Sequence, residues 1–327
     1  MADESLSTAR SNSQEEGKMG ALTDFLGAGE VATALGGVVT ALLDKLEHAV
    51  GWCANHDTPS RTAVNTYIEE IQNSDKDPLV KAALISNARK IVKEYCNQKN
   101  IVSIAIQSVK SDAKPENIDD DWLAQFMDKA RLVSAEEFQL IWGKILANEC
   151  NHPGCVPRAL LEILPRMDRS DAEAFTALKS VSVELGDAIS PVVVYNKLSY
   201  YEQWNITFDS IMNLQALGLV AANLGDFFEG YVVSSTMSTT ANYYGKKIDL
   251  SPPNELPVGC AVYTKTGDAL AKAIDATPVA GFMEEMCIPF WKKCNKMKPV
   301  FKSFEIKEER WLLKIIQNCE FLKRGET

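Results

Sequence analysis

The chain has 327 residues, of which 46% are hydrophobic and 24% are charged, and its formal net charge is −10. This length allows two domains of ordinary size, and the composition is that of a soluble globular protein rather than a disordered or membrane protein. The negative charge disfavours a protein that coats nucleic acid, because binding to phosphates needs a basic face.

Residues 1–18 are rich in Ser, Glu and Gln and have almost no large apolar side chains. Such a segment cannot bury enough surface to order itself, so we predict a disordered tail. The tail also lacks the charged and then apolar order of a secretory signal peptide. The 8 cysteines are scattered along the chain. The sequence therefore predicts a cytoplasmic protein whose cysteines are reduced thiols.

The segment "FLGAGEVATALGGVVTALLDKL", residues 25–46, resembles a dinucleotide-binding turn, a membrane span and an amphipathic helix at once. The dinucleotide interpretation fails because no β-branched strand precedes the glycines. A span fails because only residues 31–43 are uncharged, fewer than the roughly 20 residues that a bilayer needs. We predict a helix that packs on the protein core, and contact of residues 20–46 with a membrane is the alternative. Its apolar face comprises Val31, Leu35, Val38, Val39, Leu42 and Leu46.

Helical periodicity continues to about residue 185, so residues 19–185 are predicted to form one helical domain. One helix is expected to begin at Thr58 and Pro59. The stretch from "DPLV" onward is expected to continue as helix, with a break near Asn97–Asn100. A turn at "CNHPG" ends a later helix, and Pro157 can start the one after it. Two further helix starts match the capping-box pattern, Ser134 with Glu137 and Ser170 with Glu173.

The sequence pattern changes after residue 186, from continuous helical periodicity to a mixture of helix and strand signals. A helix is expected up to Leu217 with a break at Gly218, a strand-forming stretch over residues 231–250, and a strand that ends at Thr264 before a helix after Gly267. This order predicts a winged-helix-like α+β module over residues 186–275. Residues 276–327 are predicted to form a C-terminal helical extension. The predicted fold class is therefore mostly α: an N-terminal helical domain, the winged-helix-like module and the extension.

The block from "DDDWLAQFMDKARLV" to "MDRSDAEAF" resembles a bacterial family of unknown function that shares a tryptophan–leucine–alanine–glutamate block with the abortive-infection alpha proteins. The likeness extends over residues 40–275. It implies an association with phage defence and no established reaction. We expect the matching positions to have a structural role. They include Trp122, Ser134, Trp142, Glu149, Pro153 and Arg158.

Two clusters of polar residues are candidate sites. Cys53 and His56 have C-x-x-H spacing, and Cys150, His152 and Cys155 crowd one loop, but this spacing matches no standard zinc set. We therefore predict no metal and no cofactor. Glu149 and Arg158 flank the "CNHPGCVP" turn, and we expect them to fix it as an ion pair.

The chain has no nucleophile elbow, zinc-protease helix, phosphate-binding loop or kinase motif. We therefore expect no catalytic residues and no enzyme. Residues 198–220 of the winged-helix-like module contain no Lys or Arg, which disfavours a nucleic-acid partner. A basic run interleaved with aromatics is a candidate surface contact for an anionic membrane or nucleic acid, although a solvated helix face is favoured. Its residues are Lys292, Lys293, Lys296 and Lys298.

We expect a non-enzymatic bacterial host-defence or regulatory protein that acts by binding a protein partner. This expectation rests on the resemblance and on the missing catalytic motifs. Two alternatives remain open at this point. One is a membrane-acting effector that uses residues 20–46 for peripheral membrane contact, and the other is a winged-helix regulator that binds nucleic acid.

Overall fold

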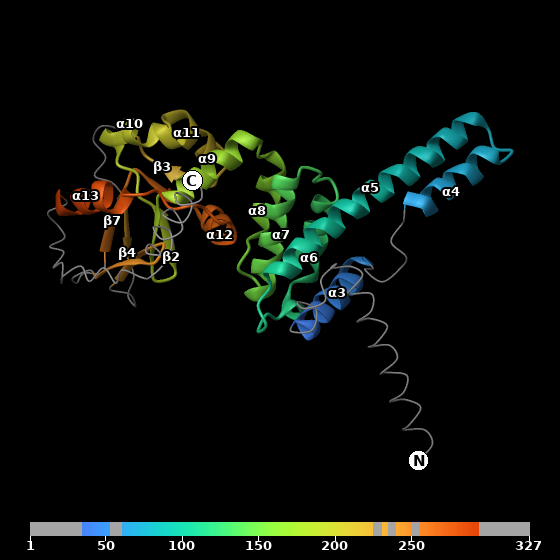
Figure 1. The fold of residues 1–327 in the computed structure, drawn as a ribbon, viewed down its shortest axis with the longest axis horizontal. Helices are drawn as coiled ribbons and strands as arrows, with labels where there is room; N and C mark the ends of the chain where they lie inside the picture. The colour runs from blue at the N-terminus through green and yellow to red at the C-terminus, as the bar shows by residue number, and fades with distance from the viewer. Residues whose placement is uncertain (1–34, 53–60, 225–230, 235–239, 250–254, 294–327) are drawn as a thin grey trace, which may run out of the picture.

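The computed structural model describes residues 35–52, 61–224, 231–234, 240–249 and 255–293, which form two halves lying side by side (Figure 1). The N-terminal half is helical, and the C-terminal half combines short helices with small antiparallel sheets. The buried apolar side chains of both halves form one continuous cluster. The prediction of a mostly helical chain is confirmed.

The helical half contains, in chain order, α3 (Gly36–Val50), α4 (Arg61–Asn73), α5 (Pro78–Ser108), the 3₁₀ turn η1 (Pro115–Asn117), α6 (Asp120–Ala130), α7 (Glu136–Asn151), α8 (Arg158–Ile163) and η2 (Leu164–Arg166). Helix α4 and the first half of α5 form an antiparallel hairpin that projects from the body (Figure 1). The second half of α5 crosses α7 closely, because Gly143 has no side chain there. A Cβ atom at this position would lie 2.5 Å from Cγ2 of Ile104.

Helix α3 packs with its apolar face on α6 and η1. Val39, Leu42 and Leu46 are fully buried there. The structure therefore confirms core packing for the described part of the predicted amphipathic helix, while Val31 lies outside the described residues. In the part of the chain that the structure describes, no helix is both long enough and apolar enough to cross a bilayer.

Helix α5 runs unbroken through Asn97–Asn100, so the break predicted there is wrong. The Asn97 amide donates to the carbonyl oxygen of Arg131 at 2.8 Å, and Asn100 donates to Oε1 of Gln139 at 3.3 Å. These side chains bond to neighbouring segments instead of competing for the backbone of their own helix, which removes the usual reason for a break. At the start of the helix, Asp77 accepts a hydrogen bond from the backbone N–H of Leu79.

Both predicted capping boxes are wrong. Helix α7 begins after Ala135 without a side-chain cap, and the Ser134 hydroxyl instead accepts a hydrogen bond from Asn97 at 3.4 Å. The capping box of α9 is formed two residues earlier than predicted, by Asp168 and Asp171. An aspartate caps as well as a serine, so the helix begins at the first competent residue. The expected start at Thr58 and Pro59 lies outside the described residues.

The C-terminal half contains α9 (Arg169–Ser180), β1 (Ser182–Leu185), β2 (Ala188–Pro191), η3 (Tyr195–Lys197), α10 (Leu198–Tyr201), η4 (Glu202–Trp204), α11 (Phe208–Ala216), β3 (Val220–Ala222), β4 (Tyr231–Ser234), β5 (Thr240–Tyr243), β6 (Lys246–Asp249), β7 (Glu255–Gly259), β8 (Ala261–Tyr263), α12 (Lys265–Ala273), the π-helical turn η5 (Met283–Cys287) and α13 (Ile288–Lys293). Strands β2, β1, β5 and β6 form one antiparallel sheet in that order. Strand β3 pairs with β8, and β4 pairs with β7. Helix α12 packs against α7 and α8 and so joins the halves.

Three local predictions in this half need correction. Strand β1 lies within the range assigned to the helical domain. The helix expected up to Leu217 is interrupted at Asn205, which adopts a left-handed conformation with φ 60°. Helix α12 begins before Gly267, because the Thr264 side chain caps it by accepting from the N–H of Gly267 at 3.1 Å. The strand prediction for residues 231–250 is confirmed for its described part.

Candidate functional site

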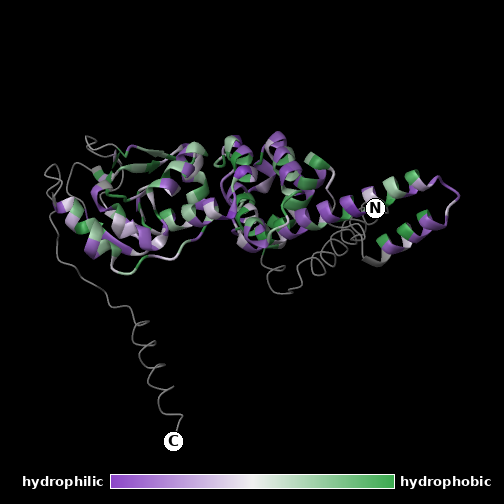
Figure 2. Ribbon diagram, turned by 90° about the horizontal axis from the view of Figure 1, so that it is seen from above, coloured by the Kyte–Doolittle hydropathy of each residue, from purple (hydrophilic) through white to green (hydrophobic). Residues whose placement is uncertain are grey.

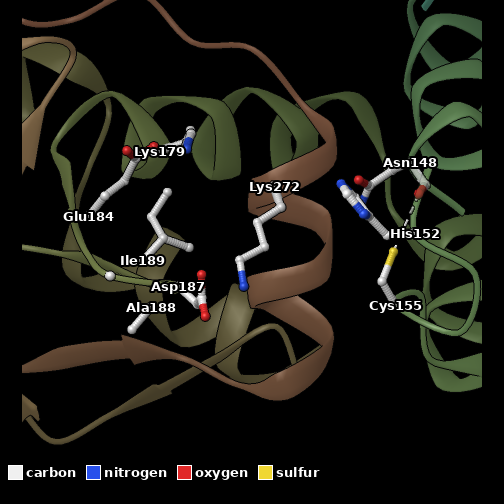
Figure 3. A pocket seen from close by; sticks show the side chains of 10 residues that line it. Asn148, His152, Cys155, Lys179, Glu184, Asp187, Ala188, Ile189 and Lys272 are labelled. Carbon is white, nitrogen blue, oxygen red and sulfur yellow. Dashed lines mark hydrogen bonds between the residues drawn. The ribbon is translucent and has the colours of Figure 1, made fainter. Parts of the chain in front are cut away.

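A cleft of about 490 Å³ opens where the two halves meet (Figure 3). The end of α7 and the loop after it form one wall, with Asn148, His152 and Cys155. The end of α9, the turn between β1 and β2, and α12 form the other. The charged side chains on this second wall are Lys179, Glu184, Asp187 and Lys272. A concave site with converging polar groups from two halves is a typical place for a small ligand.

The loop on the first wall is shaped by Glu149, which is 1% exposed. Its carboxylate accepts hydrogen bonds from the backbone N–H groups of Gly154 at 2.6 Å and Val156 at 2.9 Å. Gly154 has φ +84°, a conformation that favours glycine. The indole N–H of Trp122 donates to the carbonyl oxygen of Val156 at 3.0 Å. The Glu149 carboxylate therefore holds the loop that presents His152 and Cys155 to the cleft.

The ion pair predicted between Glu149 and Arg158 is wrong. Arg158 instead bonds Asp119 at 2.6 Å, and Asp119 also accepts from the N–H of Trp122 at the start of α6. These hydrogen bonds hold the pKa of Asp119 below its usual range. Burial is the largest influence on Glu149 and raises its pKa, although the two backbone N–H groups oppose the shift. Backbone N–H groups therefore bind the Glu149 carboxylate in place of the predicted Arg158 guanidinium group.

The other residues of the resembling block have mainly structural positions. Trp122 and Trp142 are buried on either side of Phe126, with ring centroids 5.2 and 5.1 Å from its own. Ser134 and Pro153 are exposed at helix and loop ends. The block therefore builds the helical core and the loop at the cleft.

Lys179 is a half-buried cation on the cleft wall. Burial lowers the pKa of its ammonium group, and the carboxylates of Glu184, Asp268 and Asp275 offset only part of that effect. Within the described ranges none of these carboxylates forms an ion pair with it. Glu184 instead accepts a hydrogen bond from Asn242 at 2.9 Å. A half-buried cation without a direct partner is a candidate binding group.

Lys272 enters the cleft from α12 and bonds Asp268 on its own helix at 2.7 Å. Figure 3 shows its side chain extending along the cleft toward Asp187. Asp187 is exposed at the turn between β1 and β2, where Gly186 has φ 61°. The cleft thus offers ammonium donors and carboxylate acceptors to the same ligand.

Cys155 is not set up as a nucleophile. Burial, followed by the nearby Glu149 charge, raises the pKa of its thiol to about 12, and its Sγ lies 3.5 Å from the carbonyl oxygen of Asn148. Cys150 is fully buried, whereas His152 is exposed. The described residues hold no cluster of three metal-binding side chains. Cys53 and His56 lie outside the described residues, so their predicted lack of a metal is untested.

Residues 86–287 match the family described as protein of unknown function DUF2806. The chain belongs to this family. No curated protein matches the chain, and no solved structure matches it. The DUF2806 region contains every residue that lines the cleft, together with the whole resembling block.

The basic run predicted as a surface contact begins after the DUF2806 region, which ends at residue 287. Lys292 is exposed on α13, Lys293 ends that helix, and Lys296 and Lys298 lie outside the described residues. The neighbouring Trp291 is buried, and its indole N–H donates to the carbonyl oxygen of Pro257 at 2.8 Å. At this aromatic position the favoured interpretation, a helix with aromatics in the core, agrees with the structure.

Sequence reasoning missed the charged wall of the cleft. Lys179 and Lys272 come from helices far apart in the chain, and neither lies in a motif. A lysine in the last turn of a helix is common, because it favours the negative end of the helix dipole. The packing of α9 and α12 on β2 within the C-terminal half places these two lysines on one wall of the cleft.

Proposed function

We propose that the protein is a non-enzymatic cytoplasmic binding protein that acts through protein contacts in bacterial host defence. In this proposal the cleft between the halves binds a small ligand that carries an anionic group and hydrogen-bond donors. The observation that carries it is Lys179, a half-buried ammonium group on the cleft wall without an ion-pair partner among the described residues.

The physical reason is the desolvation of Lys179. Removing an ammonium group from water is unfavourable, because the group loses its hydration, unless an anion compensates its charge. An anionic ligand between the walls supplies that compensation, and Glu184 and Asp187 can accept hydrogen bonds from the donors of the same ligand. Because the ligand would contact both halves of the folded protein, its binding would stabilise the folded state.

Binding is favoured over catalysis by the state of the only described cysteine in the cleft. A thiol with a pKa of about 12 is protonated at neutral pH, and the thiol form is a poor nucleophile. The five described cysteines are free thiols, which agrees with a reducing compartment.

The host-defence setting comes from the resemblance to a family related to the abortive-infection alpha proteins. We also propose a winged-helix-like module, supported by helix α11 before strand β3, the pairing of β3 with β8 and helix α12 after β8, although strands β4 to β7 lie between β3 and β8 in the chain. We propose that this module contacts protein rather than nucleic acid. Residues 198–220 offer no cation, and Lys246 is paired with Glu284 at 2.9 Å.

Membrane contact through residues 20–46 receives less support than protein contact. In α3, the described part of this segment, Val39, Leu42 and Leu46 are buried against the helical half. These side chains would have to leave the core to reach a lipid surface. Removing them from the core is unfavourable, because it gives up the free energy that burial of apolar area contributes.

The ligand proposal is tested by thermal unfolding of the full chain with O-phosphoserine and with AMP, two probes that carry an anionic group and hydrogen-bond donors. At least one probe is expected to raise the Tm of the wild type, because a ligand that binds only the folded state stabilises it. Lys179→Gln is expected to abolish the shift without lowering the Tm of the free protein, since it removes a desolvated charge.

Lys197→Gln is the matched control, because Lys197 is exposed on η3 and does not line the cleft. It should keep the wild-type shift. The absence of any shift in the wild type, or equal shifts in all three proteins, would contradict the ligand proposal.

A further inference from the structure

The charges on the second wall of the cleft do not balance one another in pairs. Lys272 forms an ion pair with Asp268 on its own helix, so its charge is compensated there. Lys179, Glu184 and Asp187 form no ion pair within the described residues. Figure 2 shows hydrophilic residues interspersed with hydrophobic ones where the halves meet. An anionic group bound at Lys179 would therefore leave carboxylate charge on the same wall without a cation.

Asp187 is held in place by the turn between β1 and β2. Leu185 is paired with Ala188 across this hairpin, so Gly186 and Asp187 alone form the turn. Gly186 has φ 61°, and a two-residue turn with glycine in its first position is the type II′ connection of tight hairpins. So short a turn leaves the backbone little freedom, which keeps Asp187 on the cleft wall.

The part of the wall that carries Lys179 and Glu184 is supported from β5 and the turn after it. The Tyr244 hydroxyl donates to the carbonyl oxygen of Lys179 at 3.1 Å, and the Asn242 amide donates to the Glu184 carboxylate at 2.9 Å. Figure 3 shows Lys179 and Glu184 at one end of the wall and Asp187 further along it. Positive and negative binding groups are thus held at separate places on one wall.

The two carboxylates differ in what already binds them. Glu184 has the Asn242 amide as a hydrogen-bond donor. Among the described residues no side chain bonds the Asp187 carboxylate. Asp187 is therefore the carboxylate that is free to bind a group of the ligand.

We propose that the ligand of the cleft is a small zwitterion whose anionic group binds Lys179 and whose ammonium group binds Asp187. This inference rests on the proposed function, because it names the chemical class of the same ligand. It also assigns Asp187 the role of a residue that determines specificity.

The physical reason is that a ligand in the cleft displaces water from Asp187 as well as from Lys179. A carboxylate that loses water is stabilised by a cation, and an ammonium group supplies both the charge and the hydrogen bond. A hydroxyl group supplies the hydrogen bond alone. Asp187 should therefore distinguish an amine from the corresponding alcohol.

The test is isothermal titration calorimetry of the full chain with O-phosphoserine and with 3-phosphoglycerate. The second probe keeps the carbon chain, the phosphate and the carboxylate of the first, and a hydroxyl replaces its ammonium group. We expect O-phosphoserine to have a dissociation constant at least about tenfold lower. Asp187→Asn should reduce this ratio to less than about threefold, because the charge that selects the ammonium group is gone.

Asp112→Asn is the matched control, because Asp112 is also an exposed aspartate in a turn and does not line the cleft. It should keep the wild-type ratio. Both variants should keep the wild-type Tm, since aspartate and asparagine are both suited to turns.

Three results would overturn the zwitterion and leave the anionic ligand of the proposed function in place. These results are equal binding of the two probes by the wild type, an unchanged ratio in Asp187→Asn, and binding of AMP without binding of O-phosphoserine. If none of the three probes binds the wild type, both proposals are wrong.

Discussion

Replacing Trp142 by alanine is expected to destabilise the protein by about 3–5 kcal/mol, the range for truncating a buried Phe or Trp side chain. Trp142 is 1% exposed in the middle of α7, and its ring lies 5.1 Å from that of Phe126. The surrounding side chains come from well-packed helices, so the cavity would close only in part. Chemical denaturation of the full chain measures the loss.

Leu140→Ala on the same helix is the control for this prediction. Leu140 is 46% exposed, so its truncation leaves no internal cavity and should cost less than about 1 kcal/mol. Similar losses in the two variants would show that Trp142 does not anchor the helical core.

Replacing Glu149 by glutamine is expected to cost about 1–3 kcal/mol, the penalty for leaving a buried donor unsatisfied. The carboxylate accepts from both Gly154 and Val156. A glutamine of the same shape offers one oxygen, and its NH₂ group faces the second backbone N–H. The loop that lines the cleft would therefore loosen, and urea unfolding would measure the loss. Glu137→Gln, an exposed change on the same helix, should leave the stability unchanged.

The same side chain predicts a pH dependence. Burial raises the pKa of Glu149 above its ordinary value of 4.5, so the folded state holds this proton more tightly than the unfolded state. Its contribution to stability is therefore fully present below about pH 4.5 and is lost as the pH rises through the folded-state pKa. The stability difference between wild type and Glu149→Gln should shrink over that interval. A difference that grows with pH would mean that the pKa of Glu149 is lowered in the folded protein.

The helix faces could be predicted from the sequence because their signal is local. The apolar face of α3 and the Trp122 and Trp142 positions follow helical periodicity, and packing then buries them. The predictions were wrong where a polar side chain has a partner that its spacing does not indicate. A break in α5 was predicted near Asn97–Asn100, yet Asn97 bonds a carbonyl group 34 residues away and the helix continues. Glu149 was expected to bind a cation, yet backbone N–H groups within seven residues satisfy it.

The candidate site was less predictable than the fold. The sequence singles out the loop with His152 and Cys155 because these residues are possible metal ligands. In the structure the loop forms one wall of a cleft. The opposite wall depends on the packing of α12 against α7, a contact between helices more than a hundred residues apart. No spacing within one segment reveals that Lys179 and Lys272 share a site.

We propose that Lys179 in the cleft is required for a role in host defence. The most direct test of this claim is the plating efficiency of a broad phage panel on cells that express the wild type, Lys179→Gln or Lys197→Gln at equal levels. We predict that the wild type and Lys197→Gln restrict phage and that Lys179→Gln does not. Equal restriction by Lys179→Gln and the wild type, or a wild type that restricts no phage, would contradict the claim.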